Sequence, residues 1–397
     1  MPLTPSADNA RLPVLDIMRG FALCGIIFAN LMSFTGFYSL NLSAIQQLPW
    51  ADRITLFLID WLIEGKFYTV FSILLGAGFA LQLARYSGRE ARFRAFWRRR
   101  MLVLMAIGLL HMFLIWHGDI LTLYSVLGLC LLWFTGLAAR QLLFAIVILL
   151  ALPLAIHGLL LVSIEHSFWS LLRRAVDALK LQLGYNDATL LALRTSPNSA
   201  DVFFANVFSA IPRPMAYLQT GRPFQVLGQF LLGVYLARHF LLAERPPALP
   251  SRSTVLQLMI GGLVLSAIYA GIKAATGSPF TINGLGLFQG VVYHTGATLL
   301  ALGYMGIIAR LCQAQTRRPI HKLAVLGRLS LSQYLLQTSL CVLLFYGYGL
   351  SLMGQVPFVA ITIFGAGILA LQYFWGKYWL TRHAQGPMEW LWRKLSR

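Results

Sequence analysis

The chain has 397 residues, of which 58% are hydrophobic and only 11% are charged, and its formal net charge is +19. A soluble globular chain carries about 25% charged residues, so this composition excludes an ordinary soluble domain. Apolar runs of about 20 residues, each long enough to cross a hydrocarbon core of roughly 30 Å, recur along the whole chain. The sequence therefore predicts an all-α integral membrane protein.

Ten membrane spans are predicted, which makes the fold class a polytopic helical bundle. A long polar interval after the fifth span divides the chain into a five-helix half at 1–163, an extracytoplasmic segment of amphipathic or re-entrant helices at 164–222, and a second five-helix half at 223–397. Pro212 and Pro214 are expected to break the helix in the middle segment. In chain order the predicted spans are 17–37, 66–85, 101–117, 119–137, 141–163, 223–242, 255–273, 288–309, 327–348 and 357–376.

The positive charge is concentrated in segments that fall on one side of the membrane if the ten spans alternate. The arginine-rich segments 86–100, 243–254 and 310–326 share that side. The positive-inside rule then places both termini in the cytoplasm, with the basic loops against anionic lipid headgroups. This placement accounts for the charge without a nucleic-acid partner. The cysteines lack C-x-x-C spacing, so neither a disulfide framework nor a metal site is predicted.

The first span carries three polar side chains on one face. At 100° per residue, Arg19 lies about 60° from Asp16, and Asn30 lies about 20° from Arg19 and roughly 21 Å from Asp16 along the helix axis. Ionisable groups inside a membrane usually face a bundle interior or a water-filled cavity. One interpretation is an Asp16–Arg19 pair at the cytoplasmic interface. The other, favoured by the amide of Asn30, is an inward stripe that binds substrate.

A short turn, His117-Gly118-Asp119, joins the third and fourth spans. A histidine near a carboxylate can act as a general base, so His117 and Asp119 are catalytic candidates. The alternative is an interfacial turn in which Asp119 caps the next helix. His111 is expected to be a hydrogen-bonded packing residue.

Two further polar features lie in the second half. Gln333 and Gln337 fall on one helical face with Ser330, where they can either join helices by hydrogen bonds or line a substrate path. His294, within the eighth predicted span, is a further catalytic candidate.

Several segments together resemble the YeiB-like bacterial inner-membrane proteins, which carry the domain of unknown function numbered 418 in their C-terminal half. The segments are "LDIMRGFALCGIIFAN", "GKFYTVFSILLGAGFAL", "GLLHMFLIWHGDILTLYSVLG", "GRLSLSQYLLQTSL" and "GPMEWLWR". The resemblance implies a multi-pass protein of the bacterial cytoplasmic membrane. More distantly, Asp16, Arg19 and Asn30 in the first helix are similar to the opening of the heparan-α-glucosaminide N-acetyltransferase family.

That second resemblance implies transfer of an acyl group from a cytoplasmic acyl-CoA, bound only as a co-substrate, to a glycan or other acceptor at or across the membrane. The histidine-bearing stretch of those transferases has no counterpart, because residues 38–65 contain no histidine. The catalytic role would fall to His117 with Asp119, or to His294, with Asp16, Arg19, Asn30, Gln333 and Gln337 binding substrate. The alternative function is a transporter of a small, anionic solute.

Overall fold

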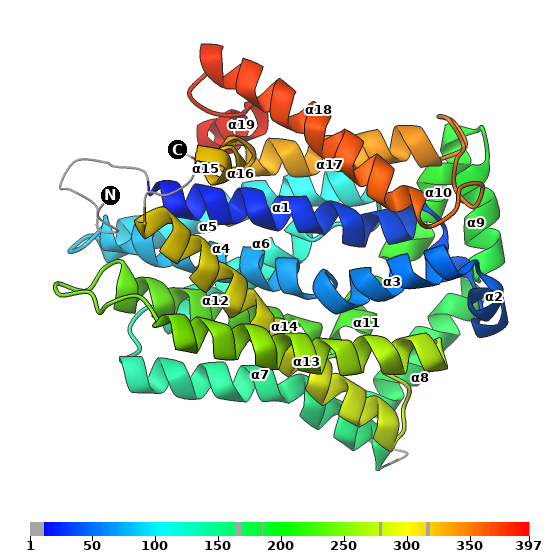
Figure 1. The fold of residues 1–397 in the computed structure, drawn as a ribbon, viewed down its shortest axis with the longest axis horizontal. Coiled ribbons are helices and arrows are strands. Elements are labelled where there is room, and N and C mark those ends of the chain that lie inside the picture. The colour runs from blue at the N-terminus through cyan, green and yellow to red at the C-terminus, as the bar shows by residue number, and fades with distance from the viewer. Residues whose placement is uncertain (1–11, 163–167, 185, 278–279, 315–317, 397) are drawn as a thin grey trace.

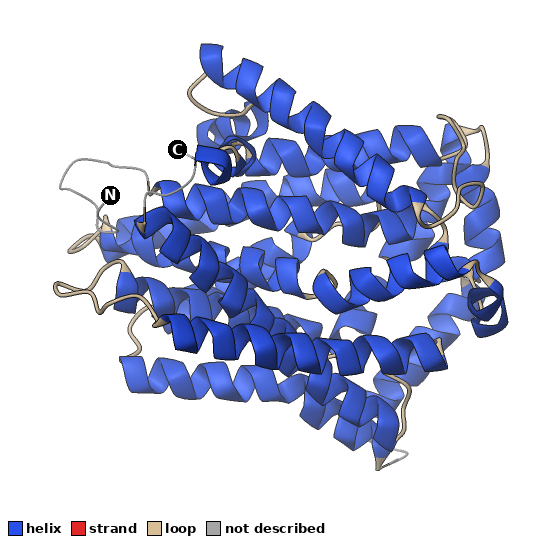
Figure 2. Ribbon diagram, in the orientation of Figure 1, coloured by secondary structure: helices blue, strands red, loops and turns tan. Residues whose placement is uncertain are grey.

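The structure is a computed structural model that describes residues 12–162, 168–184, 186–277, 280–314 and 318–396. All regular secondary structure in these residues is helical (Figure 2). The first half contains α1 (Pro13–Phe34), η1 (Phe37–Ser39), α2 (Leu42–Gln47), α3 (Trp50–Leu62), α4 (Lys66–Ala84), α5 (Glu90–Leu110), η2 (His111–Ile115), α6 (Leu121–Cys130), η3 (Leu131–Phe134) and α7 (Ala139–Leu161).

Four short helices follow in the middle segment: α8 (Phe168–Gln182), α9 (Asp187–Thr195), α10 (Ser199–Ala210) and α11 (Arg213–Gln219). The break between α10 and α11 falls at Ile211 and Pro212, as the prolines predicted. The second half contains α12 (Arg222–Phe240), α13 (Arg252–Thr276), α14 (Gly284–Gln313), α15 (Arg318–His321), α16 (Leu323–Arg328), α17 (Ser330–Phe345), α18 (Ala360–Arg382) and α19 (Pro387–Leu395).

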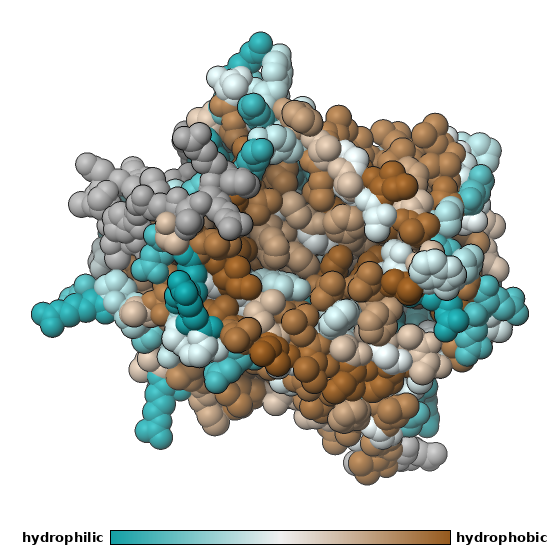
Figure 3. Space-filling view, viewed as in Figure 1, coloured by the Kyte–Doolittle hydropathy of each residue, from teal (hydrophilic) through white to brown (hydrophobic). Residues whose placement is uncertain are grey.

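Five segments are long and apolar enough to cross a membrane: Pro13–Ser39, Trp50–Ala84, Ala139–Leu161, Arg252–Thr276 and Gly284–Gln313. Their outward side chains are strongly apolar; Phe144 on α7 is 69% exposed and Leu256 on α13 is 59% exposed. Figure 3 shows such side chains covering the middle of one face, with hydrophilic residues gathered at the two ends. An exposed apolar surface of this extent indicates contact with lipid. The chain is therefore a helical integral membrane protein. The other five predicted spans are also helical but fall outside this set, so the number ten stays a prediction.

Helix α3 was not anticipated as part of a membrane-crossing segment. It leads into α4 through a three-residue break at Ile63, Glu64 and Gly65, and the two helices follow one another across the molecule (Figure 1). Gly65 adopts φ +81°, a conformation that costs glycine little and other residues more. Because charged residues interrupt the apolar pattern before residue 66, hydropathy alone predicts no span over α3.

The two halves of the chain interlock. Helix α12 packs against both α4 and α7, and α1 packs against α16, α17 and α18. At the α4–α12 contact the backbones meet directly, because a Cβ at Gly76 would overlap the carbonyl oxygen of Phe230, and one at Gly233 would overlap that of Ile73. Small residues at such contacts let membrane helices approach closely.

Helix α19 is held against the start of α17 by hydrogen bonds to Glu389. Glu389 accepts hydrogen bonds from the backbone nitrogens of Leu331 (2.7 Å) and Ser332 (3.2 Å) and from the Ser332 hydroxyl (2.5 Å). Trp392 donates to the carbonyl of Arg100 on α5 (2.7 Å). The start of α1 and the whole of α19 lie at the same end of the molecule (Figure 1).

Candidate functional site

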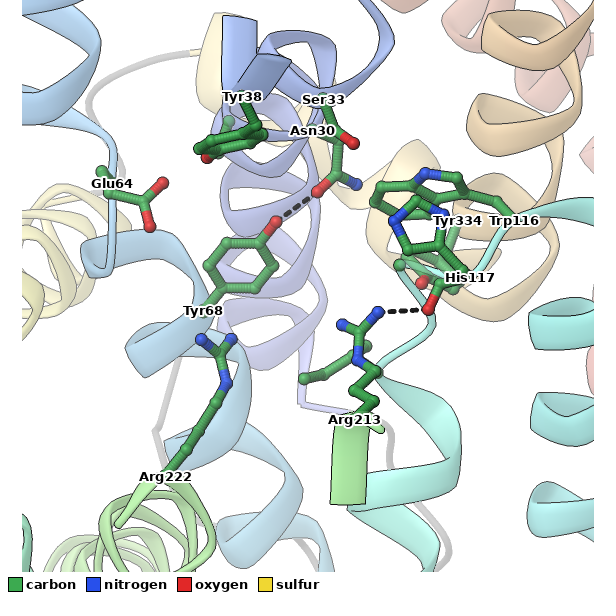
Figure 4. Close-up of a pocket in the computed structure, with 13 residues that line it drawn as sticks. Asn30, Ser33, Tyr38, Glu64, Tyr68, Trp116, His117, Arg213, Arg222 and Tyr334 are labelled. Atoms are coloured by element: carbon green, nitrogen blue, oxygen red, sulfur yellow. Dashed lines mark hydrogen bonds between the residues drawn. The ribbon is translucent and has the colours of Figure 1, made fainter. Parts of the chain in front are cut away.

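A cavity of about 230 Å³ lies where α1 approaches its end and where α4 and α12 begin. We call it the Asn30 cavity (Figure 4). The rest of its wall comes from η1, from the break between α3 and α4, from the connection between η2 and α6, from the first residue of α11 and from α17. Its polar and aromatic lining residues are Asn30, Ser33, Tyr38, Glu64, Tyr68, Trp116, His117, Arg213, Arg222 and Tyr334.

Asn30 lines the cavity in a fixed orientation. Its side chain is 6% exposed, and its amide oxygen accepts a hydrogen bond from the Tyr68 hydroxyl. Figure 4 shows the amide nitrogen turned the other way, toward the side where Trp116, Tyr334 and His117 lie. The amide can therefore offer an N–H donor to a bound molecule while Tyr68 holds its oxygen.

His117 also lines the cavity, and the middle segment of the chain holds it there. Its backbone nitrogen donates to the side chain of Asn206 on α10 (3.3 Å), and its carbonyl accepts from the guanidinium of Arg213. The ring nitrogens lie 3.4 Å and 3.3 Å from Nη2 of Arg194, which also donates to Ser209 (2.8 Å). Since a guanidinium only donates, the ring nitrogen that it contacts must be an acceptor.

Asp119 does not partner His117 among the described residues. Its Oδ1 lies 3.0 Å from Nδ1 of His111, and its Oδ2 accepts from the backbone nitrogen of Thr122 (2.7 Å). The expectation of a His117–Asp119 pair is therefore corrected to His111–Asp119, and the alternative in which Asp119 caps the next helix is confirmed. The π-helical turn η2 places His111, eight residues away, against the carboxylate.

The His111–Asp119 pair lies directly behind the cavity wall. The His111 ring packs against Tyr334, with centroids 5.2 Å apart, and near Trp116 at 6.5 Å. Both of those aromatic side chains line the cavity. Nε2 of His111 is buried and has no hydrogen-bond partner in the described part of the chain. One layer of side chains thus separates this nitrogen from the cavity.

Besides Arg213, two further charged side chains that sequence reasoning missed face the same cavity. Glu64 lies in the break between α3 and α4 and is half-buried, and Arg222 is the first residue of α12. Within the described ranges neither forms a hydrogen bond or an ion pair, and Nε of Arg222 is buried without a partner. The sequence signal for Glu64 was its place beside Lys66 at the start of an apolar run.

A smaller cavity of about 30 Å³ adjoins the first and shares Tyr68, Ile120 and Arg222 with it. It follows α4 toward the middle of the bundle. Its polar lining is internally bonded: Gln229 donates to Thr69 (3.0 Å), and the hydroxyls of Ser72 and Tyr124 are 2.6 Å apart. Polar side chains from Tyr68 to Ser72 therefore extend about one turn of α4 inward from the Asn30 cavity.

The polar stripe on α1 is divided by the structure. Asn30 lines the cavity, whereas Asp16 and Arg19 lie near the opposite end of α1 and form an ion pair of 3.1 Å. The side chain of Asp16 is 4% exposed and that of Arg19 is 28% exposed. The Asp16–Arg19 pair, which was one of the two interpretations of the sequence, is therefore present. Neither residue lines the cavity.

The remaining candidates also lie outside both cavities. Gln333 donates to the carbonyl of Gln372 (3.1 Å), and Gln337 donates to the Gln372 side chain (2.9 Å) and the Leu23 carbonyl (3.3 Å). These bonds join α17 to α18 and α1, which is the helix-joining alternative. His294 stacks on Phe280 with centroids 6.1 Å apart.

A buried charge cluster lies beside the cavity. Lys273 on α13 forms an ion pair of 2.6 Å with Asp60 on α3, and Lys66, which is fully buried, donates to the Asp60 carbonyl (2.7 Å). Both lysines went unnoticed in the sequence, although a lysine within an apolar run is a signal of a buried partner. Among the described residues, no group of three His, Cys, Asp or Glu side chains could hold a metal ion.

Comparison with known proteins identifies relatives over almost the whole chain. Residues 236–397 match the family model described as "Protein of unknown function (DUF418)". The chain is 28% identical to the uncharacterized protein YxaH of Bacillus subtilis (strain 168), over 99% of this chain and 96% of that protein. It is 27% identical to the uncharacterized protein YeiB of Escherichia coli (strain K12), over 96% of this chain and 95% of that protein.

A third relative is an uncharacterized 39.9 kDa protein in the amylase 3' region of Bacillus acidopullulyticus, 27% identical over 99% of this chain and 96% of that protein. No solved structure matches the chain. The family model covers the part of the chain from the end of α12 through α19, and the relatives extend the match through α1. The chain thus carries a DUF418 match in its C-terminal part and is similar to YxaH and YeiB along almost its whole length.

Proposed function

We propose that the chain is a transmembrane acyltransferase whose acceptor binds in the Asn30 cavity. The observation that carries this proposal is the convergence of His117, the amide of Asn30, the Tyr68 hydroxyl and the guanidinium of Arg213 around one cavity. Acyl transfer needs a base for the acceptor proton and hydrogen-bond donors for the oxyanion that develops on the acyl carbonyl. These four residues offer both functions.

In the proposed step, a hydroxyl or amine of the acceptor attacks the thioester carbonyl of an acyl-CoA donor. A new C–O or C–N bond forms, the C–S bond breaks, and the acceptor proton passes through His117 to the departing thiolate. Asn30 and Arg213 stabilise the oxyanion of the tetrahedral intermediate. The products are the acylated acceptor and free coenzyme A.

The donor would arrive from the side that carries the basic segment 86–100, whose arginines attract its phosphates. The polar side chains along α4, from Thr69 to Ser72, support entry of the reactive end of the donor through the smaller cavity. The ion pair between Asp16 and Arg19 lies at the donor end of the same helix bundle.

The arginines of the cavity also favour a second function, transport of a small anionic solute. Transport would leave the solute chemically unchanged, whereas acyl transfer releases one thiol for each acceptor modified. Purified protein in proteoliposomes, supplied with acetyl-CoA and a panel of glycans, alcohols and amines, separates the two by free-thiol assay and by mass spectrometry of the acceptor.

For the acyltransferase we expect thiol release that depends on an acceptor. His117→Ala should lower its rate by about 100-fold or more, and Asn30→Ala should lower it by about 100-fold. His239→Ala, at an exposed histidine in the last turn of α12, is the matched control and should retain the full rate. If unmodified solute accumulates in the vesicles and no thiol is released, the protein is a transporter and the acyltransferase proposal is wrong.

A further inference from the structure

We infer that the Asn30 cavity binds an amino-phosphate, with the ammonium group held by Glu64 and the phosphate held by Arg222. This inference uses the cavity that the proposed function assigns to the acceptor, and it names the chemical class of that acceptor. Its evidence is the pair of opposite charges that reach the cavity from different walls and that lack partners within the described residues.

The Glu64 wall has the composition of an ammonium site. Glu64 carries a carboxylate on the turn between α3 and α4, and the rings of Tyr38 and Tyr68 lie beside it (Figure 4). An ammonium ion bonds strongly to a carboxylate and is attracted to the faces of aromatic rings. The neighbouring acid, Asp60, is already neutralised by Lys273 at 2.6 Å, so Glu64 is the acid that remains available.

The Arg222 wall has the composition of a phosphate site. The guanidinium of Arg222 packs over the ring of Tyr217 at 5.6 Å, and its Nε has no hydrogen-bond partner in the described part of the chain. Arg213 differs, since it already donates to His117 and to the hydroxyl of Tyr217. Arg222 also begins the 19-residue helix α12, whose N-terminal dipole adds to the attraction for an anion.

Glu64 and Arg222 each lie next to a glycine with positive φ, and the two side chains do not pair with each other. Glu64 precedes Gly65 at φ +81°, and Arg222 follows Gly221 at φ +69° and precedes Pro223. Unlike charges attract strongly in a low-dielectric site, yet Glu64 and Arg222 form no ion pair with each other. A molecule with both an ammonium and a phosphate can satisfy the two together.

Lys66 changes the preferred charge of the ligand without contacting it. Its side chain is fully buried and donates to the carbonyl of Asp60, so it cannot reach the cavity. Its charge, with those of Arg213 and Arg222, leaves the region positive after Glu64 is counted. A phosphate with two negative charges and one ammonium matches that excess better than a neutral zwitterion.

The test measures binding without any acyl donor, so its result is independent of the proposed transfer reaction. Protein in nanodiscs of phosphatidylglycerol, which has no amine, is titrated with O-phosphoethanolamine, ethyl phosphate and ethanolamine by calorimetry. We expect O-phosphoethanolamine to bind at least tenfold more tightly than either half-molecule. Ethyl phosphate binding as tightly as O-phosphoethanolamine, or no binding by any of the three probes, would overturn the inference.

Two variants test which side chain binds the ammonium group and which binds the phosphate group of the ligand. Glu64→Gln should abolish the preference for O-phosphoethanolamine over ethyl phosphate while ethyl phosphate still binds. Arg222→Gln should weaken both phosphates. The matched controls are Glu244→Gln and Arg140→Gln, at exposed positions outside the cavity, which should bind as the unaltered chain does. A preference that survives Glu64→Gln would show that Glu64 does not hold the ammonium.

A second arm distinguishes a soluble phosphomonoester from a lipid headgroup that shares its ammonium and phosphate groups but whose phosphodiester carries one negative charge instead of two. Phosphatidylethanolamine is added to the phosphatidylglycerol nanodiscs, and binding of O-phosphoethanolamine is measured again. Displacement of the soluble probe, with the same loss in Glu64→Gln, identifies a lipid source. Undiminished binding of the soluble probe identifies a water-soluble source.

Discussion

The imidazole of His111 and the carboxylate of Asp119 are joined by a bond of 3.0 Å between Nδ1 and Oδ1, and both side chains are at most 1% exposed. The second carboxylate oxygen caps the start of α6 through Thr122. One acid therefore fixes the start of η2 and the start of α6, on either side of the connection that carries His117.

Replacing Asp119 should destabilise the protein. Asp119→Ala leaves a buried imidazole and a backbone N–H without partners, which costs about 3 kcal/mol. We expect a clear fall in the midpoint temperature of thermal unfolding. Size-exclusion chromatography of samples heated to increasing temperatures measures this midpoint. Asp177→Ala is the control, because its 3.8 Å contact with Arg173 is exposed and such pairs contribute little. Equal midpoints for the two variants would contradict the role given to Asp119.

The buried pair between Asp60 and Lys273 predicts strong non-additivity. Asp60→Asn alone leaves Lys273 charged and unpaired in the bundle, which costs about 3–5 kcal/mol. Adding Lys273→Met removes that charge, so the double variant should be more stable than Asp60→Asn. Thermal midpoints of the single and double variants measure this coupling. Additive losses would show that the two side chains act independently.

The contact between α4 and α12 predicts that Gly76 tolerates no side chain. Gly76→Ala forces the two backbones apart, because the added methyl overlaps the Phe230 carbonyl, and should cost about 3 kcal/mol. Gly271→Ala on α13 is the matched control, since nothing lies within 4 Å of its added methyl. The two variants are compared by the yield of monodisperse protein after detergent extraction, which should fall only for Gly76→Ala. A fully stable Gly76→Ala variant would contradict the packing described.

The ten-span topology predicts the side of each loop. Green fluorescent protein inserted after Ser87 or Pro247 should fluoresce, because these loops are expected in the cytoplasm. Alkaline phosphatase inserted after Gly349 should be active, because that loop is expected outside. The reverse pattern at any of the three positions would require a different number of spans between them.

Much of the helical architecture followed from hydropathy, since apolar runs of membrane length leave few alternatives. The same reasoning correctly placed polar Asn30 on an inward face. It paired Asp119 with the wrong histidine, because the spacing between His117 and Asp119 shows proximity along the chain but not the direction of each side chain. The π-helical turn that brings His111 to Asp119 has no clear periodic signal.

Arg213 and Arg222 illustrate a different limit. They come from short helices and turns in the middle of the chain, and the path of such a segment depends on tertiary contacts. Gln372 likewise lies in an apolar helix, α18, where its two glutamine partners on α17 cannot be foreseen from spacing. Helical periodicity assigns a face, whereas the neighbouring helix that meets that face is decided by packing.

The clasp between Glu389 and α17 sets an order of assembly. The backbone nitrogens that Glu389 accepts from belong to Leu331 and Ser332, 58 and 57 positions earlier in the chain. During synthesis, α17 must therefore be made before its N-terminal end can be capped, and it gains this cap only after α18 has been made and the chain has turned back. Closure of this end of the bundle is thus a late event, and α19 acts as the latch that completes it.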